Sequence, residues 1–172
     1  MQIAITGISG IKIKDVNRTL VELDEIKGEA FFQIFDADKV AGWKHLYYSA
    51  INALYAAETG LTISNKIEIE ALLYASAQDQ ISKAIEMIGV TSATKNLALL
   101  VIAENPESTT KSIIQYLGKE DEDVLDLDED KFHNLKEVYE ITDKALVTLD
   151  GNKYDALESL IIEKCALMPL LR

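Results

Sequence analysis

The sequence has few of the residues on which small proteins build covalent cross-links or metal centres. It holds one cysteine, two histidines and two prolines among 172 residues. A single cysteine, Cys165, excludes an internal disulfide framework and a structural zinc site built on cysteines. No apolar run approaches the roughly 20 residues of a membrane span, and no basic-then-apolar leader opens the chain. These absences favour a cytoplasmic protein with no membrane segment.

Positive charge is scarce as well. The 17 lysines and arginines stand against 29 aspartates and glutamates, which gives a net charge of −12 and a pI near 4.6. Proteins that hold nucleic acid through its phosphates usually carry a basic face, so any such face here must be small and local. The acids are concentrated near 120–130. We expect one domain over 1–172, in which an acidic loop near 119–130 is the only candidate for an internal boundary.

The period of the apolar pattern changes several times along the chain, which is typical of a mixed fold. Strand-like runs predict at least four strands of one mixed or antiparallel sheet, at 2–6, 30–35, 67–75 and 96–103. The turn-like segment 7–10 and the short run 11–13 predict an opening hairpin. Stretches of helical period lie near 15–25, 40–57, 78–88, 106–117, 132–139 and 154–168. The expected fold class is α+β.

The clearest helix follows a turn at Asp36 and Asp38, either of which can cap it. An amphipathic helix turns its apolar face to the core. Here that face is lined by Val40, Trp43, Tyr47, Ala50, Leu54 and Ala57, and widened by Leu46 and Ile51. His45 is expected at the surface or boundary of this helix, and not as a catalytic base.

Most catalytic signatures are absent. Residues 7–10 lack the frame and the Lys-Ser/Thr ending of a phosphate-binding loop. His45 and His133 lie in different helices, without the spacing of metal ligands. Cys165 lies on the apolar stripe of the last helix, as a small buried hydrophobe. We therefore expect no catalytic residue, no metal ligand and no cofactor.

One acidic cluster has a second interpretation. Asp126, Asp128, Asp130 and Glu137 have the spacing of the ligands in a calcium-binding EF-hand loop. Lys131, however, replaces the glycine that this loop needs for its sharp turn. An acidic loop that caps the following helix explains the same residues, and it is the interpretation we prefer.

Residues 68–89 are predicted to form a buried strand, a tight turn of small residues and a helix. A helix N-terminus reached directly from a buried strand carries free backbone N–H groups, which can hold an anion or a polar ligand. The simpler interpretation is that Ser76 caps the helix. The candidate residues for binding a ligand or tRNA at this turn are Tyr74, Ser76, Gln78, Gln80 and Lys83.

The same segment resembles the TPRKB family, the small accessory subunit of the KEOPS complex. The family pattern, Leu-Tyr-Ala-Ser-Gly, then Arg-Gln-Ile, Ala-Ile and a glycine, is matched at Leu73, Tyr74, Ala75, Ser76, Gln80, Ile81, Ala84, Ile85 and Gly89. An upstream block, with an Asp-x-Asp turn and a His-Leu-x-x-Ala helix, is matched at Gln33, Asp36, His45, Leu46 and Ala50. The resemblance covers 1–104. The chain departs from it at Ala77, where the family usually has glycine, and at Asp79, where it usually has arginine.

The resemblance implies a non-catalytic protein that binds the N-terminal lobe of a PRPK-type atypical kinase and supports its ATPase activity. In the family, that kinase sits on the subunit that makes threonylcarbamoyl-adenosine in tRNA, and archaeal relatives also hold the tRNA acceptor end. Asp79 and the negative net charge oppose tRNA binding here, so we expect it to be weak and salt-dependent. Two alternatives stay open: a small-molecule or metal-binding α/β domain using the Ser76–Gln80 turn or the acidic loop, and a hydrolase-like enzyme built on paired carboxylates.

The last helix carries more apolar residues than one buried stripe needs. Surplus apolar residues on a soluble protein commonly mark a partner site. The predicted kinase interface consists of Leu160, Ile162, Leu167, Leu170 and Leu171. The alternative is that these residues fill a second side of the core.

Overall fold

The computed structural model describes residues 1–171. The strands are β1 (Gln2–Ser9), β2 (Phe31–Asp36), β3 (Leu97–Ala103) and β4 (Lys119–Glu120). The α-helices are α1 (Val16–Ile26), α2 (Trp43–Thr59), α3 (Ile67–Ser76), α4 (Ile81–Ile88), α5 (Pro106–Leu117), α6 (Glu129–Val138), α7 (Asp143–Leu146) and α8 (Lys153–Ala166). Short 3-10 turns are η1 (Ala37–Lys39), η2 (Glu122–Leu125) and η3 (Met168–Leu171).

The four strands form one sheet in the order β2-β3-β1-β4, and every neighbouring pair is antiparallel. Gln2 lies opposite Ala103 across β1 and β3, and Phe31 lies opposite Ile102 across β2 and β3. β3 is buried along almost its whole length, because it lies inside the sheet with helices over both faces. The predicted α+β class is confirmed, as are the strands expected near 2–6, 30–35 and 96–103.

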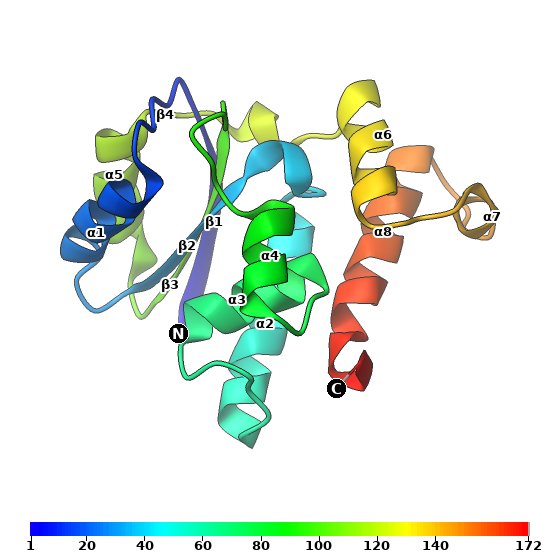
Figure 1. Ribbon diagram of the computed structural model, residues 1–172, viewed down its shortest axis with the longest axis horizontal. Coiled ribbons are helices and arrows are strands. Elements are labelled where there is room, and N and C mark those ends of the chain that lie inside the picture. The colour runs from blue at the N-terminus through cyan, green and yellow to red at the C-terminus, as the bar shows by residue number, and fades with distance from the viewer. Residues whose placement is uncertain (172) are drawn as a thin grey trace.

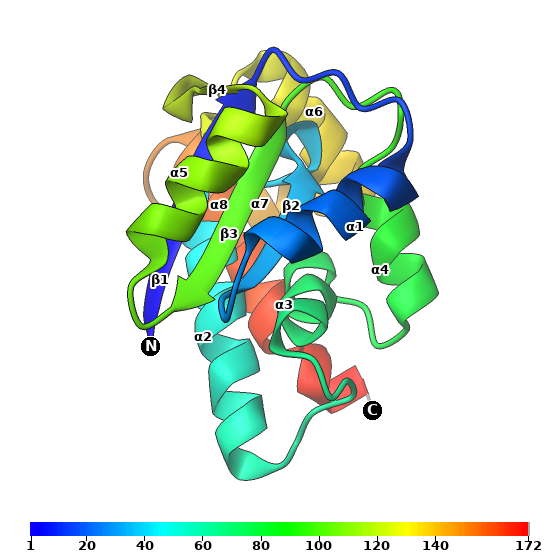
Figure 2. The same ribbon diagram turned by 90° about the vertical axis from the view of Figure 1, so that its left-hand side faces the viewer.

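Helices cover both faces of the sheet (Figure 1). α1 and α5 lie on one face, the side turned toward the viewer in Figure 2. α2 and α3 lie against the other face with α4 beside α3, and α6 and α8 lie beyond them, farther from the sheet (Figure 1). Each face has its own apolar core: Leu23 and Ile113 belong to the α1–α5 side, and Leu46, Leu73 and Ile161 belong to the larger side.

The prediction of a strand at 67–75 is wrong, because this segment is helix α3. The alternation of isoleucine and glutamate at its start imitates a strand. In the helix, Glu68 and Glu70 occupy the first turn, where negative charge is favourable. From Glu70 to Ser76 every residue is buried, so the helix has no polar face and shows no helical period. Burial on all sides removed the signal that separates a helix from a buried strand.

The prediction of an opening hairpin is also wrong. β1 continues through Gly7, which lies opposite Ala98 of β3, and it ends only at Ser9. A side chain on Gly7 would lie 2.2 Å from the backbone oxygen of Asp121, so glycine here allows close approach of another segment and does not form a turn. Ile11 and Ile13 are buried but lie outside the strands. The fourth strand is β4, within the segment expected to be an acidic loop.

Candidate functional site

Helix α2 turns its large side chains outward. Its buried side consists of small residues and two larger ones: His45, Leu46, Ser49, Ala50, Ala53 and Ala56. This side packs against α3, α8 and β1. Trp43 and Tyr47, which the apolar pattern placed on the face toward the core, are 54% and 37% exposed. Small residues allow the neighbouring helices to approach closely, so the bulky side chains lie on the outer side.

The exposed side chains of α2 form one continuous apolar surface. Trp43, Tyr47 and Ile51 follow one another at intervals of four residues, and Tyr48 and Tyr55 lie beside them, seven residues apart. The Trp43 and Tyr47 rings meet edge to face with centroids 6.2 Å apart, and the Tyr47 and Tyr48 rings with centroids 5.7 Å apart. Tyr55 is the most exposed of the five, at 64%. We call this surface the aromatic face of α2: Trp43, Tyr47, Tyr48, Ile51 and Tyr55.

The start of α2 is fixed against α8. Gly42, which precedes the helix, has a φ of 91°, a conformation that favours glycine, and a side chain there would lie 2.8 Å from Oε1 of Glu158. Lys44 Nζ lies 3.4 Å from the second oxygen of the same carboxylate. Partial burial raises the pKa of Glu158, and the neighbouring Lys44 opposes that shift. One edge of the aromatic face therefore borders α8 in a defined position.

His45 is fully buried, so the expectation of a surface or boundary position is wrong. Its Nδ1 accepts a hydrogen bond from the backbone N–H of Ala41 at 3.1 Å, and its Nε2 lies 2.8 Å from the backbone oxygen of Ala75. An acceptor at Nδ1 and a carbonyl at Nε2 fix the neutral tautomer with hydrogen on Nε2. Desolvation lowers the pKa of His45 to about 4. The residue holds α2 against the end of α3.

The carbonyl of Ala75 also accepts hydrogen bonds from two later segments. Tyr139 Oη donates to it at 3.0 Å, and Cys165 Sγ lies 3.5 Å away. Burial raises the pKa of the Cys165 thiol to about 12, so the side chain stays protonated and is a small buried group, as expected. Positions in both family-like sequence blocks, His45 and Ala75, thus meet in the core and join α2 to α3.

The residues predicted as a kinase interface on the last helix fall into two groups. Leu160 and Ile162 are half-buried on α8. Leu167 and Leu170, just beyond the helix, are 48% and 78% exposed. The side chain of Leu171 lies outside the described residues. The buried stripe of α8 consists of Ala156, Leu157, Ile161 and Cys165. The exposed apolar residues of this region therefore gather at its C-terminal end.

The predicted ligand-binding turn is a connection between two helices, and most of it is enclosed. Tyr74 and Ser76 are buried in the last turn of α3, and Ser76 Oγ donates to the backbone oxygen of Leu73. Ser76 therefore does not cap α4, which begins only at Ile81. The side-chain nitrogen of Gln78 lies 3.7 Å from the sulfur of Met87. Gln80 and Lys83 are the exposed members of the predicted set.

Two departures from the family-like pattern have physical consequences at this connection. Ala77 ends α3 with a φ of 51°, a left-handed conformation that glycine adopts without strain. Asp79 stands two residues before α4, where its negative charge interacts favourably with the helix dipole but repels a phosphate. Alanine at position 77 therefore adds backbone strain that glycine would avoid, and aspartate at position 79 disfavours an anionic ligand.

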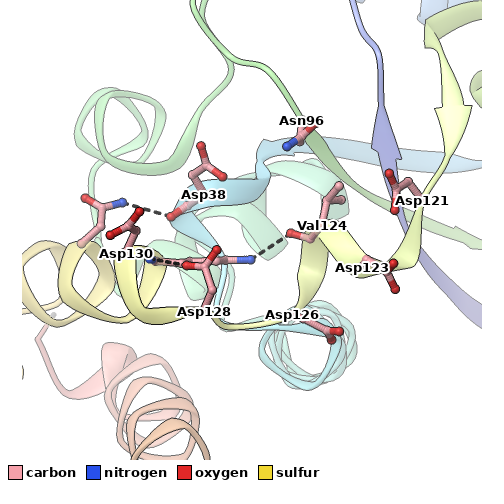
Figure 3. A pocket seen from close by; sticks show the side chains of 10 residues that line it. Asp38, Asn96, Asp121, Asp123, Val124, Asp126, Asp128 and Asp130 are labelled. Atoms are coloured by element: carbon pink, nitrogen blue, oxygen red, sulfur yellow. Dashed lines mark hydrogen bonds between the residues drawn. The ribbon is translucent and has the colours of Figure 1, made fainter.

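A cavity of about 570 Å³ lies beside the acidic loop (Figure 3). It is lined on one side by Asp38 and Asn96 and on the other by the segment around η2 and the start of α6. Six aspartates line it: Asp38, Asp121, Asp123, Asp126, Asp128 and Asp130. Asp128 caps α6 by accepting from the backbone N–H of Lys131, which is the capping role predicted for the acidic loop. Within residues 1–171, no group of three or more acids, histidines or cysteines is placed to hold a metal ion.

A lysine holds this loop from the inside. Lys131 Nζ donates to the backbone oxygens of Val124 and Leu125, at 3.0 and 3.2 Å. Burial lowers the pKa of Lys131 to about 8, and Asp38 and Asp128 oppose that shift. Lys131 is the residue that departs from the EF-hand pattern, and its ammonium group bonds the loop carbonyls directly.

Comparison with known proteins connects the sequence to one family. A family model described as "Kinase binding protein CGI-121" matches residues 12–168. The chain belongs to the CGI-121 family. It is also 36% identical over 111 residues to the "Regulatory protein Cgi121" of Methanocaldococcus jannaschii, which covers 64% of this chain and 70% of that protein. The CGI-121 match extends through the acidic loop and α8, well beyond the 1–104 segment that carried the resemblance. None of the helices within residues 1–171 combines the length and the apolar character of a membrane-spanning segment.

Proposed function

We propose that this protein is a non-catalytic, kinase-binding subunit of a KEOPS complex, and that the aromatic face of α2 is its main contact with a PRPK-type kinase. The observation that carries the proposal is that a member of a kinase-binding family exposes a tryptophan, three tyrosines and an isoleucine on one helix side. Tryptophan and tyrosine dominate the binding energy of protein interfaces, because they bury large areas at little entropic cost.

The exposed leucines at the end of α8 form the second part of the proposed interface. Leu167 and Leu170 keep the role predicted from the sequence, whereas Leu160 and Ile162 contribute mainly to packing because they are half-buried. In this proposal the protein supports the ATPase activity of the kinase by binding it, and supplies no catalytic group.

Calorimetric titration of the kinase subunit from the same organism tests the main contact. Trp43→Ala should weaken binding by about thirtyfold or more, as expected for an aromatic anchor worth about 2 kcal/mol. Its melting temperature should stay within about 3 °C of the wild type, since Trp43 is more than half exposed.

Tyr55→Ala and Tyr116→Ala form a matched pair for the same titration. Both remove an exposed tyrosine from a helix, but Tyr116 lies on α5, across the sheet. Binding should weaken for Tyr55→Ala and stay unchanged for Tyr116→Ala. Equal effects of the two changes, or no kinase binding by the wild type, would contradict the proposal.

We further propose weak binding of the tRNA acceptor end at the start of α4. Ile81, Ser82 and Lys83 begin the helix, so their backbone N–H groups have no partner within it. Lys83 and Gln80 are exposed beside them. Single-stranded ends need few contacts, so a small patch suffices in an acidic protein. The proposal rests on the family resemblance together with this helix end, and Asp79 opposes it.

Gel-shift titration at low salt with full-length and end-trimmed tRNA tests this second proposal. Binding should require the intact acceptor end and should weaken steeply with salt. Asp79→Arg should tighten it, and Lys83→Glu should weaken it. Equal affinity for both tRNAs, or none for either, would leave kinase binding as the role of this chain.

A further inference from the structure

A second cavity lies between α1 and the α3–α4 pair. Its volume is about 530 Å³, in the range of sites that hold small organic molecules. The edge strand β2 forms its floor, and the two helical layers form its walls. Apolar side chains predominate in the lining, among them Leu20, Phe32, Ile69, Leu72 and Ile85.

One wall of this groove contains a carboxylate with one buried oxygen that has no hydrogen-bond partner within residues 1–171. Glu68, in the first turn of α3, lines the groove. Its Oε2 is buried and accepts no hydrogen bond from any residue of the described chain. A buried acceptor without a donor costs free energy, so a donor brought by a ligand is favourable. Glu70, two residues later, differs because its Oε2 accepts from the backbone N–H groups of Ile63 and Ser64.

The floor of the groove is closed to strand addition, which excludes one class of occupant. β2 lies at the end of the sheet, so one side of its backbone has no neighbouring strand. The side chain of Gln33 takes that place, because its Nε2 donates to the backbone oxygen of Ile34 at 3.0 Å. Ile34 is also 2% exposed, so an extended peptide finds no open edge to pair with.

The walls select the charge of the occupant. Besides Glu68, the groove is lined by Asp24 and Glu25 of α1, and Lys66 is the one basic residue among the lining residues that the structure describes. The pKa of the Asp24 carboxyl is lowered mainly by its hydrogen bond and ion pair with Lys27, and Lys66 adds to that shift. The excess of carboxylates favours a cation over an anion.

We propose that this groove is a binding site for a small apolar molecule that carries a protonated amine. The apolar body packs between Leu20 on one wall and Ile69 and Ile85 on the other. The ammonium group donates to the Glu68 carboxylate, and Asp24 and Glu25 on the opposite wall add to the negative charge around it. The site is separate from the aromatic face of α2, so it does not depend on the proposed kinase contact.

A matched pair of fragments tests the proposal without any mutation. The probes are 2-(2-naphthyl)ethylamine and 2-naphthylacetate, which share an apolar body and differ in charge. Titration of the whole protein, followed by backbone amide chemical shifts, should show amine binding with a Kd on the order of 1 mM. The shifts should gather in α1, α3 and α4, and the acetate should bind at least about tenfold more weakly. Equal affinities, or shifts outside these helices, would overturn the proposal.

Variants then assign the contacts. Glu68→Gln should lower the affinity for the amine to that for the acetate, and Leu20→Trp should block both probes by filling the groove. Val147→Trp, an exposed position beyond α7, is the control and should change neither. If Glu68→Gln binds the amine as tightly as the wild type, the Glu68 carboxylate is not the acceptor of the ammonium group, and the proposal is wrong. Tighter binding of adenosine than of the amine, in the same groove, would show that the site selects a nucleobase, and the amine proposal would be wrong.

Discussion

Helices α2 and α8 pack against each other but distribute their apolar residues in opposite ways. α2 buries mostly small residues and exposes its aromatic face. α8 buries Leu157, Ile161 and Cys165, and exposes Asp155, Ser159 and Glu163 on its other side. Both helices have many apolar residues, but only α2 exposes large apolar side chains within the helix itself. The size of the exposed residues on each helix, and not their number, is the reason why we propose α2 as the surface that meets a partner.

The contrast follows from how closely the helices approach. Ala50, Ala53 and Ala56 of α2 leave room for α3 and α8 to pack near its axis. Large side chains on that side would separate the layers. α8 contacts α2, α3, α6 and α7, and its buried stripe contains leucine and isoleucine where α2 has alanines. Substitutions on the two sides of each helix, and at the junction between the helices, test this contrast.

The largest expected effect comes from the buried stripe of α8. Leu157→Ala should lower the free energy of unfolding by about 3 kcal/mol, because Leu157 is fully buried and the change leaves a cavity. Denaturant unfolding measures this loss. Ser159→Ala, an exposed change on the same helix, should alter stability by less than about 0.5 kcal/mol. If both variants lose the same stability, α8 does not pack through the stripe described.

The second prediction concerns pH and the buried side of α2. The pKa of His45 is about 4 in the folded protein, against about 6.5 for a free histidine. The unfolded chain therefore binds a proton between these values and the folded protein does not. Stability from this group is complete above pH 6.5 and falls as the pH drops toward 4, by about 3 kcal/mol in total.

Comparison with His45→Gln isolates this dependence from that of the many carboxylates. Glutamine can accept from Ala41 and donate to Ala75, yet it does not titrate. Unfolding curves at pH 7, 5.5 and 4.5 should show a steeper loss for the wild type than for the variant. Parallel losses would mean that His45 does not stay neutral in the folded protein.

The third prediction places the same charge on the outer side of each helix. Ile51→Glu on α2 should weaken kinase binding by about thirtyfold with little change in melting temperature, since Ile51 is 40% exposed. Ile162→Glu on α8 should weaken binding by less than about threefold, and should lower stability by about 1–2 kcal/mol because Ile162 is half-buried. Calorimetry and thermal unfolding measure both quantities. Loss of binding by Ile162→Glu at unchanged stability would place the main interface on α8, as the sequence predicted.

The smallest effect is expected at the ion pair between the two helices. Lys44→Ala removes the partner of Glu158, but the lysine side chain is half exposed and the distance is 3.4 Å. Exposed pairs of this kind contribute about 0.5 kcal/mol or less, and salt screens them. Thermal unfolding in low and high NaCl should show a small difference that disappears at high salt. A large loss at both salt concentrations would mean that Lys44 contributes through packing.

The sequence predicted the elements better than it predicted which residues are exposed. Elements with a polar side, such as α1 and α5, were found from their apolar period, and β3 was found from its unbroken apolar run. Helix α3 was not found, because a helix that is buried on every side shows no helical period of apolar residues in its sequence. A strand at 67–75 would leave Tyr74 and Ser76 accessible at the turn that follows it, whereas helix α3 buries both.

The aromatic face was missed for a different reason. Apolar periodicity identifies the side of a helix that avoids water, and an interface avoids water in the same way once its partner is bound. Trp43 and Tyr47 therefore looked like core residues. The row of alanines on the opposite side of the helix was the available signal, because small residues mark the side where helices pack closely.

The carbonyl of Ala75 has a consequence for the order of folding. It joins residues from four parts of the chain, and the Cys165–His45 contact spans 120 positions. Contacts between such distant positions close large loops, at an entropic cost that the pairing of β1 with β3 also carries, because Gln2 lies opposite Ala103. The sheet can form without α8, whereas this cluster is complete only when the last helix has docked. A chain that stalls during folding should therefore stop with α8 undocked and with the end of α3 open to amide exchange.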